Sequence, residues 1–232
     1  MIPGPVSLVV FFLCIVAVTA LLLAAKSSQL GAGVLVWLAF TGLAGWFGLV
    51  RDFRRLPPPM FVLLLAAMTL TILTALSRVG SRLVAEAGIV WLVGMQAFRI
   101  AVEVFLDWAQ RADLVPVQMT FEGRNWDIAS GVSAIAVAWL AARMRAQRWL
   151  ILAWNCVGLV LLLNIVVIAT LSMPTPLRRF HNEPANSFVA YFPYIWLPTF
   201  LVQVALFGHL LVFRWLRRET SGKSVVLNQE NQ

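Results

Sequence analysis

Four polar side chains share one face of the helix expected in and just after the apolar run between residues 83 and 106. Gln96, Arg99, Glu103 and Asp107 fall within an arc of roughly 80° when successive residues turn by about 100°. Most other side chains in this run are apolar, so the helix belongs in lipid. An arginine and a glutamate are costly there unless partners enclose them. We therefore expect the other helices to close around this polar face.

The chemistry of this face is that of an ion or ligand site. Arg99 is suited to anchor an anion, and Glu103 to carry a proton or bind a cation. Two polar loops, which are expected at the same end of the molecule, add further carboxylates, amides and a histidine. The complete set of candidate binding residues is Gln96, Arg99, Glu103, Asp107, Glu122, Arg124, Asn125, Asp127, His181, Glu183 and Asn186.

A purely structural role explains the same charges. Arg99 and Glu103 lie one helical turn apart and can neutralise each other inside a bundle. Arg124 can pair with Asp107 or Glu183 and hold the loops together. The sequence leaves both explanations open.

Other polar residues in or beside the spans have simple structural roles. Asn125 and Asp127 are good N-caps for the helix that follows them. Asn155 and Asn164 are nine residues apart and face opposite sides of their helix, so one of them is expected to face the polar centre. His209 is expected to pack or cap locally.

Metal, cofactor and catalytic signals are weak. His181 and Glu183 are the best metal-ligand candidates, but a single histidine without paired spacing is poor evidence. We find no His-Glu-x-x-His, Gly-x-Ser-x-Gly, Walker or Cys-x-x-Cys pattern. The only lysines, Lys26 and Lys223, lie outside the expected spans, which excludes a retinal Schiff base. No cofactor is expected and no catalytic residue can be named, which favours a non-enzymatic protein.

Composition indicates an integral membrane protein. Apolar residues make up 61% of the 232, charged residues only 12%, and the mean hydropathy is +0.85. A soluble domain is nearer half apolar and a quarter charged. The net charge of +8 comes from basic residues in short groups at the ends of apolar runs, which is typical of membrane topology. The expected partner is therefore the lipid bilayer, and no nucleic acid.

Seven apolar runs are long enough, or nearly so, to cross a bilayer. We expect an all-α, seven-helix transmembrane bundle in a single domain, residues 1–218, followed by a disordered cytoplasmic tail, residues 219–232. The predicted spans are approximately 5–25, 33–50, 60–77, 83–106, 128–143, 149–171 and 192–214.

Charge distribution predicts the orientation. No Lys or Arg precedes Lys26, which favours translocation of the N-terminus. With the N-terminus outside, inner segments carry ten basic residues and outer segments seven. Seven of the ten acids then fall outside or in the outer half of the span at 83–106, so the polar centre is predicted to open outward.

Two segments carry a resemblance to known proteins. The segment from Met119 to Ile128, preceded by Phe98-Arg-Ile-Ala-Val-Glu103, resembles a family of small uncharacterised bacterial multi-span membrane proteins. The resemblance covers the middle third of the chain and the proline-rich stretch before the last span. It implies a bacterial plasma membrane, most simply the inner membrane, and no particular activity.

Three functions fit these observations. The favoured one is binding or translocation of a small polar solute or ion through an outward-facing pocket lined by residues 83–106. The second is a membrane-embedded enzyme that acts on a lipid-borne or periplasmic substrate with a carboxylate as acid–base group. The third is a structural or assembly subunit of a membrane complex, in which the buried charges serve packing alone.

Overall fold

The computed structural model describes residues 3–143 and 147–230, with side chains described as far as Arg218, and this part of the chain contains helices but no strands. The predicted disordered tail, residues 219–232, thus lies outside the described side chains. Three short 3-10 turns lie at Met95–Ala97, Val117–Met119 and Phe188–Ala190. The α-helices are α1 Val6–Ala24, α2 Ser28–Trp46, α3 Pro59–Leu76, α4 Arg78–Gly94, α5 Phe98–Arg111, α6 Ile128–Arg143, α7 Arg148–Leu171 and α8 Val202–Glu230.

Each of the seven predicted spans overlaps a helical segment, although the second helix, Ser28–Trp46, begins and ends earlier than the predicted 33–50. Six segments are long and apolar enough to cross a membrane, with α4 and α5 counted together as Arg78–Arg111 and the last one as Leu197–Arg218. The remaining helix, α6, is apolar but has only 16 residues. Tryptophans near helix ends are exposed, as expected for side chains at the two membrane–water interfaces: Trp46, Trp108, Trp126, Trp139 and Trp149. The all-helical class is as predicted, and six segments have the length and composition that a membrane span requires.

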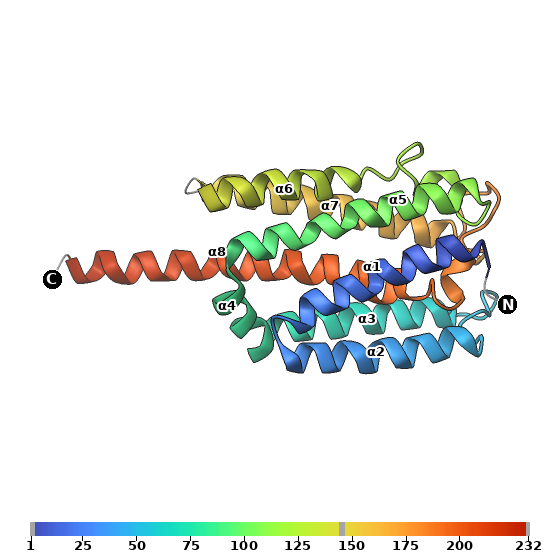
Figure 1. Cartoon of the computed structure of the whole chain (residues 1–232), viewed down its shortest axis with the longest axis horizontal. Helices are drawn as coiled ribbons and strands as arrows, with labels where there is room; N and C mark the ends of the chain where they lie inside the picture. Colours follow the sequence, from blue (N-terminus) through green and yellow to red (C-terminus); the bar gives the residue numbers. More distant parts are fainter. Residues whose placement is uncertain (1–2, 144–146, 231–232) are drawn as a thin grey trace.

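The helices run side by side and alternate in direction (Figure 1). The N-terminus and the connections 47–58, 112–127 and 172–196 lie at one end, which we call the loop end. α8 runs through the centre and packs against α3, α4 and α7. In the span Leu197–Arg218, to which α8 contributes most residues, 72% of the residues are buried. In each of the other spans the share of buried residues is 44% or less. The last helix therefore forms the core on which the earlier helices pack.

The α4–α5 segment is interrupted rather than continuous. Gly88 has φ 70° and ψ 164°, a backbone conformation that glycine alone adopts without strain. The chain bends there, passes through the 3-10 turn Met95–Ala97 and continues as α5. The single unbroken helix predicted for 83–106 is thus wrong at Gly88, and the portion after the bend presents Arg99 and Glu103 to the interior.

The last span begins with a π-helical turn, Leu197–Leu201, instead of at residue 192. Pro198 has no backbone N–H to offer, and a widened turn accommodates it. The side chain of Gln203 donates from Nε2 to the Pro198 carbonyl at 2.9 Å. Thr71 of α3 donates to Gln203 Oε1 at 3.2 Å, which ties this turn to α3.

Candidate functional site

Arg99 is the centre of the buried polar cluster, with 2% of its surface exposed. Its Nε donates to Asp127 Oδ2 at 2.7 Å, and Nη2 binds the other oxygen of the same carboxylate. Nη1 donates to His209 Nε2 at 2.8 Å, and Nη2 also reaches the Gly158 carbonyl at 3.3 Å. Such a bidentate, fully enclosed guanidinium links α5 with α7, α8 and the residue preceding α6. All three of its nitrogens bind groups of the protein.

The partner of Arg99 is therefore Asp127 rather than Glu103. The predicted neutralisation of Arg99 by Glu103, one turn away on the same helix, is wrong. Both oxygens of Asp127 bind the guanidinium, so its carboxylate serves the ion pair. Planar bidentate pairing stabilises a buried carboxylate better than a single contact along a helix face does. This explains why Arg99 pairs with the distant Asp127 rather than with Glu103 on its own helix.

His209 extends the cluster into α8. Because arginine can only donate, the Nε2 atom that faces Arg99 must be the unprotonated nitrogen. Its Nδ1 lies 2.8 Å from Asn155 Oδ1, and Asn155 Nδ2 donates to the His209 carbonyl at 3.1 Å. All these donors and acceptors match when the imidazole is neutral and protonated on Nδ1. The prediction that Asn155 or Asn164 faces the polar centre is met by Asn155, and the local role expected for His209 is wrong.

Two glycines allow the helices to approach closely enough for this network. A Cβ added to Gly158 of α7 would lie 2.6 Å from His209 Cε1. A Cβ added to Gly131 of α6 would lie 2.8 Å from a side-chain carbon of Ile100, next to Arg99. Only residues without a side chain fit there, so α6 and α7 can both contact the Arg99 region.

Glu103 lies one turn from Arg99 and is 5% exposed. Its Oε1 accepts from Asn125 Nδ2 at 2.6 Å, and Asn125 also donates to the Met119 carbonyl and accepts from the Asp127 N–H. Its Oε2 is buried and has no hydrogen-bond partner. With Arg99 balanced by Asp127 and His209 neutral, the buried cluster contains one more acid than base.

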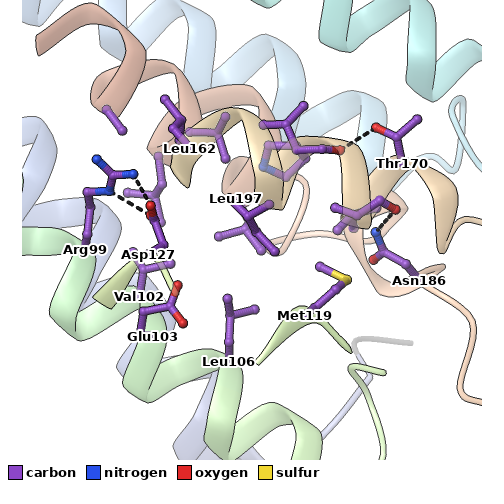
Figure 2. Close-up of a pocket in the computed structure, with 18 of the residues that line it drawn as sticks. Arg99, Val102, Glu103, Leu106, Met119, Asp127, Leu162, Thr170, Asn186 and Leu197 are labelled. Carbon is purple, nitrogen blue, oxygen red and sulfur yellow. Dashed lines mark hydrogen bonds and ion pairs between the residues drawn. The ribbon is translucent and has the colours of Figure 1, made fainter. Parts of the chain in front are cut away.

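A cavity of about 70 Å³ borders this cluster. Arg99, Glu103 and Asp127 line one end, and Thr170 and Asn186 lie across the cavity from them (Figure 2). The remaining lining is mostly aliphatic and comes from α3, α5, α7, the π-turn and α8, with Met119 contributed by the loop that follows α5. Figure 2 shows the Glu103 carboxyl group on the cavity side of α5, near the Arg99–Asp127 pair. The arrangement is an apolar chamber with one carboxylate oxygen free to accept a hydrogen bond.

Of the eleven predicted site residues, five lie at the cluster or its cavity, one is buried elsewhere and five lie apart from both. Arg99, Glu103, Asn125 and Asp127 come together, and Asn186, buried and bonded to the Ala169 carbonyl at 2.8 Å, lines the far side of the cavity. Gln96 is buried too but turns toward α8, where Nε2 donates to the Ala205 carbonyl at 3.0 Å. The remaining predicted residues are outside the cavity lining: Asp107, Glu122, Arg124, His181 and Glu183.

The residues outside the cavity have solvent or local partners. Asp107 pairs with Arg111 one turn later, and Glu183 pairs with Arg178 at 3.0 Å. Their partnership with Arg124, predicted from the sequence, is thus wrong. The guanidinium of Arg124 instead lies over the Phe180 ring at 5.4 Å. The hydrogen bond from Arg178 lowers the pKa of Glu183, because it stabilises the ionised carboxylate.

The predicted metal candidates do not converge. His181 is exposed, and Glu183 is engaged by Arg178. Over residues 3–143 and 147–218, no three His, Cys, Asp or Glu side chains are grouped so that they could hold a metal ion. The cavity beside Glu103 is therefore the candidate site for a ligand of the polar cluster.

Comparison with known proteins places the chain in a family. No curated protein and no solved structure matches it significantly. A family model described as a domain of unknown function, DUF8737, matches residues 56–217. The match begins just before α3 and ends within α8, so it includes every residue of the buried polar cluster. Because it covers more than half of the sequence, the chain belongs to the DUF8737 family.

Proposed function

We propose that this protein binds a small organic cation in the cavity beside Glu103, with the carboxylate as its counter-charge. The observation that carries the proposal is the buried, unpartnered Oε2 of Glu103 on the cavity wall. An ionised carboxylate that lacks a counter-charge, as Glu103 does here, is strongly disfavoured away from water, even with one hydrogen bond to Oε1. A proton or a cation must therefore neutralise it, and the cavity provides space for the cation.

The volume and lining of the cavity limit which ligands could fit. A volume of about 70 Å³ has room for about five water-sized groups, since one water needs roughly 10–15 Å³ by this measure. The mainly aliphatic walls favour an alkyl body, and Oε2 favours an ammonium or another hydrogen-bond donor. Arg99 does not serve as an anion anchor in this proposal, because its nitrogens already bind Asp127, His209 and Gly158.

Binding in this way exchanges a cation for a proton. In the empty cavity Glu103 carries a proton, and an entering alkylammonium ion binds to the carboxylate while that proton leaves to water. The exchange keeps the buried charge constant, which is the condition for moving a charged ligand into a low-dielectric interior. Exchange of this kind is the basis on which a membrane protein can also translocate the cation.

We further propose that the protein lies in the bacterial inner membrane with its N-terminus outside and its C-terminus in the cytoplasm. The charge-free segment before Lys26 and the excess of basic residues in the inner segments support this orientation. The loop end then faces outward, and the cavity lies on that side, because Met119 and Asn186 from the two long loops line it.

The test uses the purified full-length protein in detergent with n-butylammonium as the probe. We expect butylammonium to raise the melting temperature, while butanol and butyrate at equal concentration do not. Calorimetry in buffers of different ionisation enthalpy should show release of about one proton per bound cation. Glu103→Gln should abolish both effects, and Glu86→Gln, at an exposed position on α4, should retain them. Undiminished butylammonium binding by Glu103→Gln would overturn the proposal.

A further inference from the structure

A second and larger cavity lies at a different place in the bundle. Its volume is about 290 Å³, and it is bordered by α2 and α3, with α8 behind them and the ends of α1 and α4 beside it. Leu30 and Trp37 of α2, Leu70 of α3 and Phe207 of α8 are among its apolar wall residues. None of its lining residues belongs to the Glu103 cavity, so the two spaces are separate.

This cavity is an open groove between two helices. α2 packs closely on α1, whereas its contact with α3 is weak at most. α2 is held to the centre by Trp37 Nε1, which donates to the Thr199 carbonyl at 2.8 Å, and by Trp196 Nε1, which donates to the Leu38 carbonyl at 3.0 Å. Gly33 lines the groove and is exposed, and a Cβ added to it would meet nothing within 4 Å. The side between α2 and α3 is therefore accessible from the lipid.

Apart from the exposed Gln29 at one end, the polar side chains along the groove already have hydrogen-bond partners within the protein. Thr71 Oγ1 donates to Gln203 Oε1, and Gln203 Nε2 donates to the Pro198 carbonyl. Thr74 Oγ1 donates to the Leu70 carbonyl of its own helix. An occupant of the groove thus needs no polar group along its length, and the chemistry that fits is an alkyl chain.

The end of the groove away from the loop end is basic. Gln29 lines the groove there and lies three residues after Lys26. Val79 lines it too and directly follows Arg78. Lys26 Nζ lies 5.7 Å from the centre of the Trp91 ring, so the turn before α2 contacts α4. Within the part of the chain whose side chains are described, neither Lys26 nor Arg78 belongs to an ion pair. Two basic residues without an ion-pair partner, each close in sequence to a residue that lines this end of the groove, favour an anionic headgroup there.

We propose that the groove between α2 and α3 binds one acyl chain of an anionic phospholipid, with the phosphate held near Lys26 and Arg78. The chain enters sideways from the bilayer, and the headgroup stays at the interface where these two basic residues lie. The bound acyl chain fills the gap that the weak α2–α3 contact leaves, so the lipid stabilises the position of α2.

The experiment compares phosphatidylglycerol with phosphatidylcholine of the same acyl chains, added to delipidated full-length protein in detergent. Binding is counted by native mass spectrometry, and stability is followed by the melting temperature. We expect phosphatidylglycerol to bind at one copy and to raise the melting temperature by several degrees, and phosphatidylcholine to do so at least tenfold less effectively.

Variants separate the chain from the headgroup. Gly33→Phe fills the groove and should remove both lipid effects, while Ala32→Phe, at the neighbouring exposed position outside the groove lining, should behave as wild type. The double variant Lys26→Gln with Arg78→Gln should reduce phosphatidylglycerol binding to the phosphatidylcholine level. Equal effects of the two lipids on the wild type, or unchanged phosphatidylglycerol binding by Gly33→Phe, would overturn the proposal.

Discussion

The Nε2 atom of His209 accepts a hydrogen bond from the Arg99 guanidinium at 2.8 Å, across 110 residues of sequence. This contact leaves Nδ1 as the protonated nitrogen, which faces Asn155 Oδ1. A protonated imidazole has no acceptor for Arg99 and would place a second cation beside it. The histidine is thus a neutral connector between the ion pair and α7.

Replacing this connector should destabilise the protein. His209→Ala leaves one Arg99 nitrogen and the Asn155 amide oxygen without partners, and we expect a loss of roughly 2–4 kcal/mol in the free energy of unfolding. Chemical unfolding in detergent micelles, followed by tryptophan fluorescence, measures the change. His181→Ala, which alters an exposed loop residue, is the matched control and should have no effect. Equal stability of the two variants would contradict the hydrogen-bond network described here.

A double-mutant cycle should identify Asp127 as the energetic partner of Arg99. Arg99→Met alone strands a buried carboxylate and should cost about 3–5 kcal/mol. Combining it with Asp127→Leu should recover most of this loss, because both charges are then gone. The same cycle with Glu103→Gln should give a coupling energy below about 1 kcal/mol. A larger coupling energy of Arg99 with Glu103 than with Asp127 would instead support the pairing of Arg99 with Glu103 that the sequence allows.

Two glycines should respond oppositely to the same substitution. A Cβ on Gly208 of α8 would clash with the Gln96 amide, so Gly208→Ala should lower the free energy of unfolding by about 1–3 kcal/mol. Gly33→Ala meets open space and should raise it by up to about 1 kcal/mol, since alanine has the higher helix propensity. Detergent unfolding curves of the two variants provide the comparison. A loss of stability in Gly33→Ala would show that this face of α2 is closed.

Reporter fusions should place the two ends of the bundle on opposite sides of the membrane. A tag inserted near Ala112, at the loop end, is expected to be external, and one fused after Arg218 to be cytoplasmic. Alkaline phosphatase and green fluorescent protein activities distinguish the two locations. If both tags report the same side, the alternation of the helices across the bilayer is incorrect.

The lengths of the apolar runs and the cost of buried charge are sufficient to predict where most helical segments lie and the centre of the site, but not the bend at Gly88 or the turn that begins the last span. A charged residue inside an apolar helix must face the interior, and this argument alone identifies Arg99 and Glu103. Asn125 and Asp127 were identified because the loop that contains them had to lie above the same helix. These inferences depend on local composition, which the sequence displays directly.

The pairing within the site was beyond such reasoning. Proximity along one helix favoured Glu103 as the partner of Arg99, but a carboxylate at the start of α6 offers the better bidentate geometry. One histidine in an apolar run resembles a packed core residue, so the sequence predicts only a local role for His209. The available signal is the spacing of Asn155 and Gly158 on α7. They lie about one turn apart, so an amide stands beside a small residue that lets a polar group approach closely.

Residue type alone does not indicate which loop residues line the cavity. His181, Glu122 and Glu183 have the chemistry of ligands, yet water and neighbouring side chains satisfy such groups wherever a loop is exposed. The position of Gly88 gave no hint of a bend, because glycines also occur inside regular transmembrane helices. Only the three-dimensional arrangement separates a glycine at a bend from one at a helix contact.

The spacing of the Arg99 partners along the chain has a consequence for biosynthesis. Arg99 leaves the ribosome 28 residues before Asp127 and 110 residues before His209. While α5 is being synthesised, its guanidinium therefore lacks the Asp127 and His209 partners that it has in the finished bundle, and a charged side chain without such partners is costly in lipid. The nascent helix must be retained in the aqueous environment of the insertion machinery, or beside a chaperone, until α6 begins. Release of the finished bundle must in turn await synthesis of α8, the last element to join the network.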